Sequence, residues 1–193
     1  MLLMKRIKLN IHWMKTRYGS GRGFLMMYWH GLRNRFGAYD KHKHVDWKDI
    51  KRVVFICKGN ICRSAFAERV ARKVGVEVIS CGINAIVDGP ANREAVRIAK
   101  QMGYDLSVHR TTPIMYPIFL KSDLLVVMEP EQSDIVKYYL TKAHHITLLG
   151  LWGKPERPFI YDPYGTTPEY FRSCFNFIEK SVYAIADKIR KED

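Results

Sequence analysis

The sequence predicts an α/β protein with an open parallel sheet of about four strands, flanked by helices on both faces. Two observations carry this prediction. From about residue 52 onward, short apolar runs rich in β-branched residues alternate with helical patterns. The runs are continuously apolar, which is typical of parallel strands covered on both faces. Such sheets bind their ligands at the carboxyl ends of the strands.

The elements are expected in a simple order. The predicted strands are Arg52–Cys57, Glu77–Cys81, Asp123–Met128 and His145–Leu149, and helices are predicted at roughly 64–74, 91–102 and 130–141. A final helix is clearly marked, because Thr167 can cap it and Pro168 suits its first turn. Its apolar residues share one face and are expected in the core: Phe171, Cys174, Phe175, Ile178, Val182, Ile185 and Ile189.

Composition bounds the kinds of protein that the chain can be. With 193 residues, 47% of them hydrophobic, it can bury one core and carry an extension. Four cysteines without a signal-peptide pattern indicate reduced thiols in a cytoplasmic protein. No metal site is expected, because no second Cys or His pair follows Cys57 and Cys62 at zinc-binding spacing, and no organic cofactor is expected either. The apolar run Phe24–Trp29 is too short to cross a bilayer.

Residues 1–50 are predicted to form a basic, aromatic N-terminal extension to a domain at 51–193. They hold eleven Lys and Arg against three Asp and Glu, so +8 of the net charge of +13 lies there. An apolar stripe recurs every four residues, as on one face of a helix: Phe24, Tyr28, Leu32 and Phe36. We expect a partly helical arm that packs on the domain or on a second copy. Membrane-surface contact is a less favoured alternative, and nucleic-acid binding is not expected.

The stretch after the first strand has the pattern of an anion-binding loop. Backbone N–H groups of the loop and of the following helix converge on one point, where they favour a phosphate-like group. The same donors stabilise a thiolate at Cys57 and make it a nucleophile at neutral pH. Arg63 can hold two oxygens of the anion with its planar guanidinium. The residues expected to bind phosphate are Lys58, Gly59, Asn60, Ile61, Cys62, Arg63 and Ser64.

Two of these loop residues have further expected roles. Ser64 can donate a hydrogen bond to the sulfur of Cys57, and Asn60 can fix the loop from a left-handed conformation. A Cys and an Arg at this spacing alone form a weak pattern. The full string C-x-G-N-x-C-R-S, between an apolar strand and a helix, is more specific. It resembles the signature of the low-molecular-weight protein tyrosine phosphatases and their bacterial relatives.

The resemblance extends over about residues 50 to 190. The segments similar to the family are SCGINA at 80–85, HRTTPI at 109–114, SDLLVVMEPEQ at 122–132 and YDPYG at 161–165. It implies that Asp162 protonates the departing tyrosyl oxygen and then activates water. Asp-Pro-Tyr-Gly is also an ordinary turn, and both interpretations can hold. Tyr164 is implied to line the cleft and to stack beside the substrate ring.

The resemblance also implies supporting residues. His109 is expected to hold the loop through Asn60, and Asn84 to be a second polar support. Ile86 falls where some members carry an aromatic specificity residue, and bacterial relatives of exopolysaccharide systems have an aliphatic one. Lys58 departs from the family, which commonly has an apolar residue there, and Cys81 replaces a small, unreactive residue.

The implied function is hydrolysis of protein phosphotyrosine through a cysteinyl-phosphate intermediate. The partner is a phosphotyrosine protein, and the resemblance suggests a bacterial tyrosine kinase or a polysaccharide-export protein. Two alternatives stay open: an arsenate reductase of the same fold, which needs downstream cysteines as a redox relay, and a non-catalytic phosphoprotein-binding module. Cys62 is also a redox candidate, because a disulfide with Cys57 would shield the nucleophile from over-oxidation.

Overall fold

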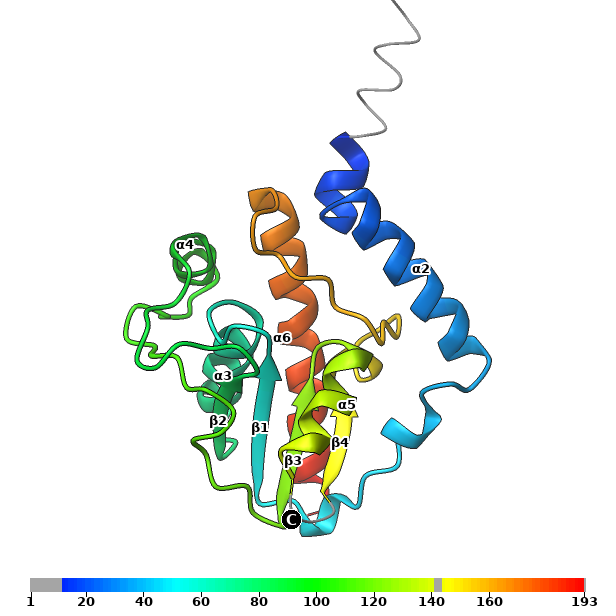
Figure 1. Cartoon of the computed structure of the whole chain (residues 1–193), viewed down its shortest axis with the longest axis vertical. Coiled ribbons are helices and arrows are strands. Elements are labelled where there is room, and N and C mark those ends of the chain that lie inside the picture. Colours follow the sequence, from blue (N-terminus) through cyan, green and yellow to red (C-terminus); the bar gives the residue numbers. More distant parts are fainter. Residues whose placement is uncertain (1–11, 141–143, 193) are drawn as a thin grey trace, which may run out of the picture.

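The computed structural model describes residues 12–140 and 144–192. A parallel sheet of four strands lies at its centre, in the order β2-β1-β3-β4 (Figure 1). The strands are β1 (Arg52–Cys57), β2 (Val78–Gly82), β3 (Asp123–Val127) and β4 (His145–Leu148). Each begins within one residue of its predicted start. Residues 1–11 of the predicted extension and residue 141 of a predicted helix lie outside the described residues.

The helices follow the predicted alternation. They are α2 (Gly21–Arg35), α3 (Arg63–Lys73), α4 (Arg93–Gln101), α5 (Pro130–Tyr138) and α6 (Pro168–Arg190), with short 3-10 turns at Asp40–His42, Trp47–Asp49 and Leu149–Leu151. Thr167 caps α6 by accepting a hydrogen bond from the backbone N–H of Tyr170 at 3.4 Å. None of the helices in the described part of the chain is long and apolar enough to span a membrane.

Both faces of the sheet are covered, which confirms the predicted architecture. Val53 and Phe55 of β1 join a core with α3, α4 and α6, whereas Val54 and Ile56 join a second core that includes Val136 of α5. Successive residues of a strand point to opposite faces, so a strand buried on both sides needs an unbroken apolar sequence. Cys174 of α6 lies in the first core, as expected.

The carboxyl ends of the strands bring distant segments together. Cys57 at the end of β1 pairs with Gly82 at the end of β2. A Cβ atom at Gly82 would lie 2.8 Å from the backbone nitrogen of Asn60, so only glycine lets β2 approach the loop this closely. Beside β3, the backbone N–H of Ile160 donates to the carbonyl of Met128 at 2.9 Å. This hydrogen bond holds residues 160–162 at the carboxyl-end edge of the sheet, where Cys57 also lies.

Helix α2 packs against the rest of the chain through a different face from the one predicted. The stripe of Phe24, Tyr28, Leu32 and Phe36 is 39%, 66%, 40% and 80% exposed. The buried residues of α2 are Gly23 and His30. A Cβ at Gly23 would lie 3.0 Å from the ring of Tyr161, and the His30 ring stacks on Phe159 with centroids 4.9 Å apart. The predicted helix exists, but the stripe is not the face that packs on the domain, and its packing on a second copy stays a prediction.

Candidate active site

The thiol of Cys57 lies at the base of the loop that follows β1, and it is only 3% exposed. Two donors face its sulfur. The backbone N–H of Asn60 donates to Sγ at 3.3 Å, and the Ser64 hydroxyl lies 3.0 Å from it. Asn60 has a φ of +54°, in the left-handed region, which turns its N–H inward. Hydrogen bonds of this kind favour the thiolate form of a cysteine.

Asn60 also holds the loop in place with its side chain. Its amide nitrogen donates to the hydroxyls of Ser64 at 2.9 Å and Ser80 at 2.8 Å, and its side-chain oxygen accepts from the backbone of Thr112 at 2.9 Å. Nε2 of His109 lies 2.8 Å from the Asn60 carbonyl oxygen. Because Asn60 is fully buried, these bonds fix the loop before any ligand arrives.

A buried network stands behind these contacts. The Ser80 hydroxyl donates to Glu68 Oε2 at 2.5 Å, and Nδ1 of His109 lies 4.0 Å from the same oxygen. Burial lowers the pKa of His109, so its neutral ring uses Nε2–H to donate to the carbonyl of Asn60. Sequence reasoning missed Ser80 and Glu68. A polar residue within an apolar strand and a carboxylate on the buried face of α3 were the available signals.

Arg63 is 1% exposed, and carboxylates hold it in the site. One Nη pairs with Glu129 and donates to the Ile160 carbonyl at 2.7 Å, and the other pairs with Asp162 at 2.8 Å. Burial of Arg63 disfavours its charged form and lowers its pKa. The negative charges of Asp162 and Glu129 have the larger combined effect, so the pKa of the guanidinium is raised. The buried Nε–H finds no acceptor among the described residues. Sequence reasoning missed Glu129, which follows β3.

A cavity of about 240 Å³ joins most of the predicted site residues. Its lining consists of Cys57, Lys58, Gly59, Ile61, Cys62, Arg63, Asn84, Asp162 and Tyr164. Asn84 supports the loop by its backbone, whose N–H donates to the Lys58 carbonyl at 2.8 Å, rather than by its side chain as expected. Ile86 is not among the residues that line this cavity and is 68% exposed, so its place in the substrate pocket stays a prediction.

Asp162 occupies a turn and the cavity wall at once. Its Oδ1 accepts a hydrogen bond from the backbone N–H of Tyr164 at 3.2 Å, while Oδ2 pairs with Arg63. The two interpretations of this segment are therefore compatible, since the turn aims the carboxylate at the loop. Tyr164 is 63% exposed at the cavity mouth. The arrangement offers a thiol, a buried guanidinium and a carboxylate around one small space.

Comparison with known proteins agrees with this geometry. The family model for low molecular weight phosphotyrosine protein phosphatase matches residues 52–193. The chain belongs to this family. The match begins at β1, so α2 and the segment before β1 lie outside it.

The alignments with individual relatives span nearly the whole length of those relatives. The probable low molecular weight protein-tyrosine-phosphatase EpsP of Ralstonia nicotianae is 33% identical over 144 residues, which are 73% of this chain and 97% of that protein. Etp of Escherichia coli K12 is 30% identical over 142 residues, 72% of this chain and 95% of that protein. The crystal structure of the tyrosine phosphatase Wzb from Escherichia coli K30, in complex with sulphate, shares 31% identity. The superposition covers 72% of this chain and 99% of the Wzb chain, with a TM-score of 0.64.

The other three thiols of this phosphatase are buried. Burial raises the pKa of Cys62, and it raises the pKa values of Cys81 and Cys174 to about 12. All three are therefore protonated at neutral pH, and a thiol is a poor nucleophile. Cys62 nevertheless lines the same cavity as Cys57, so its predicted redox role stays a prediction.

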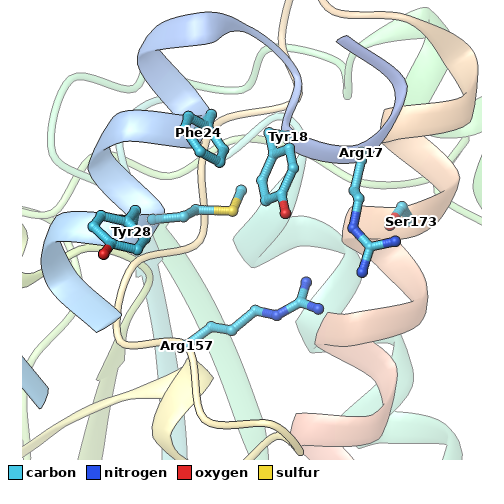
Figure 2. A pocket seen from close by; sticks show the side chains of 7 residues that line it. Arg17, Tyr18, Phe24, Tyr28, Arg157 and Ser173 are labelled. Atoms are coloured by element: carbon cyan, nitrogen blue, oxygen red, sulfur yellow. The ribbon is translucent and has the colours of Figure 1, made fainter. Parts of the chain in front are cut away.

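A larger cavity of about 460 Å³ lies apart from this chemistry, between α2 and α6 (Figure 2). It is lined by Arg17, Tyr18, Phe24, Met27, Tyr28, Arg157 and Ser173. None of the predicted site residues of the phosphatase belongs to it. The smaller cavity is nevertheless the candidate active site, because Cys57, Arg63 and Asp162 converge on it.

Proposed function

We propose that this phosphatase hydrolyses phosphotyrosine in proteins through a cysteinyl-phosphate intermediate on Cys57. The observation that carries the proposal is the buried Nε–H of Arg63, which lies beside a loop of donors and finds no acceptor in the described part of the chain. An unsatisfied buried donor costs about 1–3 kcal/mol. A phosphate oxygen bound above Cys57 would accept from Nε–H while Glu129 and Ile160 keep Nη1 in place.

The positions of three side chains support the proposed reaction. The Cys57 thiolate attacks phosphorus, the bond from phosphorus to the tyrosyl oxygen breaks, and the Asp162 carboxyl gives that oxygen its proton. Water then attacks the phosphoryl group and Asp162 takes a proton from it. The S–P bond breaks, inorganic phosphate leaves, and the hydroxyl of Ser64 stabilises the released thiolate. Arg63 balances the charge on the transferring group in both steps.

The depth of the site supports tyrosine as the target. Cys57 is almost fully buried at the base of the cavity, whereas Tyr164 is exposed at its mouth. A phosphotyrosine ring can pass Tyr164 and place its phosphate on the loop, while the short side chain of phosphoserine leaves its phosphate farther from the sulfur. Stacking of the two aromatic rings adds about 0.5–1.5 kcal/mol.

The alternatives receive less support. A redox relay for arsenate reduction needs reactive downstream thiols, and Cys174 is buried in α6 with a pKa of about 12. A binding module would not need Asp162 beside the thiol and the guanidinium. The natural substrate stays a prediction, with a tyrosine kinase or a polysaccharide-export protein suggested by the resemblance.

The test is phosphate release in EDTA from a phosphotyrosine peptide and a matched phosphoserine peptide. The parent and Cys174→Ser, a control buried thiol, should turn over only phosphotyrosine, and Cys57→Ser should turn over neither. Equal turnover by Cys57→Ser, or equal use of phosphoserine, would overturn the proposal. If Cys57→Ser binds the peptide and the parent never releases phosphate, the binding module is favoured.

A further inference from the structure

Helix α2 forms one wall of a second cavity beside the reactive one. This cavity of about 400 Å³ is lined by Arg22, Met26, Lys58, Glu129, Glu131, Phe159, Tyr161, Asp162 and Tyr164. Lys58, Asp162 and Tyr164 also line the cavity that holds Cys57. The two cavities are therefore neighbours at these three side chains. A chain that placed phosphotyrosine above Cys57 could continue into the space lined by Arg22 and Met26.

Specific contacts hold this wall in position. Gly23 lets α2 approach the ring of Tyr161, and Met27 packs against the main core. One turn later, the ring of His30 stacks on Phe159, and its Nε2 lies 3.3 Å from Glu131. The face of α2 with Phe24 and Tyr28 lines the other cavity (Figure 2). Because Tyr161, Phe159 and Glu131 also line the cavity with Arg22, the helix is docked on the cleft itself.

The charges in this cavity leave positive charge available to a ligand. The carboxylates of Glu129 and Asp162 both pair with Arg63. Arg22 and Lys58 are exposed, and neither forms an ion pair with a carboxylate in the part of the chain that the structure describes. Glu131, which faces the His30 ring, is the remaining carboxylate of the lining. Arg63 carries one positive charge against its two carboxylates, so the charges in and behind this lining sum to about zero. Arg22 and Lys58 are the cations without a carboxylate partner in the described structure, and an acidic side chain can pair with them.

We propose that this cavity is a substrate subsite that binds acidic side chains flanking the phosphotyrosine, through Arg22 and Lys58. The inference rests on the proposed function, since it places the phosphotyrosine itself above Cys57. An extended chain advances about 3.3 Å per residue, so residues one to three positions from phosphotyrosine reach this space. Met26 provides an apolar floor for the aliphatic stem of a glutamate. The extension thereby gains a part in substrate choice.

The test compares phosphotyrosine peptides flanked by Glu, Ala or Lys with para-nitrophenyl phosphate, which has no flanking chain. The parent should favour the Glu peptide, and Arg22→Ala should lower kcat/KM for it about two- to fivefold, the range of an exposed charge pair. Arg22→Glu should reverse the preference between the Glu and Lys peptides. The effect should act mainly on KM and weaken with salt. Turnover of para-nitrophenyl phosphate should be unchanged in both variants.

The matched control is Arg35→Ala, which removes the same charge at the far end of α2, outside the cavity with Arg22 and the cavity with Cys57. It should behave as the parent. If the parent hydrolyses the Glu, Ala and Lys peptides equally well, or if Arg35→Ala changes selectivity as much as Arg22→Ala, the subsite is refuted and the proposed function stands. If the parent turns over neither the peptides nor para-nitrophenyl phosphate, the proposed function itself has failed.

Discussion

Asn60 offers a quantitative test of how the loop is held. Its buried side chain makes hydrogen bonds with Ser64, Ser80 and Thr112, and its φ of +54° is unfavourable for most residues. Asn60→Ala removes all three bonds and keeps a Cβ in the left-handed region. Asn60→Gly removes the same bonds without that Cβ. The pair therefore separates hydrogen bonding from backbone strain.

The expected costs follow from these contacts. Three neutral hydrogen bonds contribute about 1 kcal/mol each, so losing them costs about 3 kcal/mol of unfolding free energy. An alanine at positive φ adds about 1 kcal/mol. We expect a loss of about 4 kcal/mol for Asn60→Ala and about 3 kcal/mol for Asn60→Gly. Both losses are below the 5–15 kcal/mol that folded domains commonly have, so the variants stay measurable.

Urea unfolding of the parent and both variants measures these losses, and turnover of para-nitrophenyl phosphate reports on the loop. Turnover should fall at least about tenfold in both variants, because the donors no longer hold their positions. A loss below about 1 kcal/mol in Asn60→Ala would refute the reasoning. An equal loss in the two variants would refute the part assigned to backbone strain.

Three further predictions test other parts of the structure. Gly82→Ala places a Cβ 2.8 Å from the backbone of Asn60, so it should lower kcat strongly while circular dichroism stays that of the parent; unchanged kcat would contradict the close packing. Burial lowers the pKa of His109 from 6.5, so below about pH 6.5 the unfolded chain binds more protons than the folded one and stability falls as pH drops. Urea unfolding between pH 7 and 5 should show a shallower fall for His109→Gln than for the parent, and equal slopes would contradict it. A disulfide between Cys62 and Cys57 would protect the nucleophile from over-oxidation. After treatment with peroxide and then with thiol, Cys62→Ser should therefore recover less activity than the parent. Equal recovery would refute that protection.

The strands were predictable because burial on both faces of the sheet produces a simple pattern in the sequence. A strand covered on both faces is apolar along its buried length, and the runs at 53–57 and 124–127 satisfy this condition. The charged residues that begin the two strands, Arg52 and Asp123, form an ion pair with each other. The face of α2 was not predictable in the same way. Gly23 packs because it has no side chain, and His30 packs by stacking on Phe159, so neither contributes to an apolar stripe. The residues with the larger apolar side chains remained exposed.

The site could be predicted where the chemistry is local in the chain. Cys57, Asn60 and Arg63 belong to one loop and the start of α3, and the full string C-x-G-N-x-C-R-S between a strand and a helix indicates an anion site. Glu129, which follows β3, pairs with Arg63 only because β3 lies beside β1 in the sheet. Arg22 reaches the cleft through the docking of α2, which no spacing in the sequence encodes.

The most direct test of the account is to find the covalent intermediate. In Asp162→Asn, para-nitrophenyl phosphate can still phosphorylate Cys57, because its leaving group needs no proton, while water attack lacks its base. Rapid acid quenching followed by mass spectrometry should find one phosphoryl group on the peptide that contains Cys57, together with a burst of nitrophenol equal to the enzyme. A phosphoryl group on another residue, or a burst of nitrophenol from Cys57→Ser, would contradict the account.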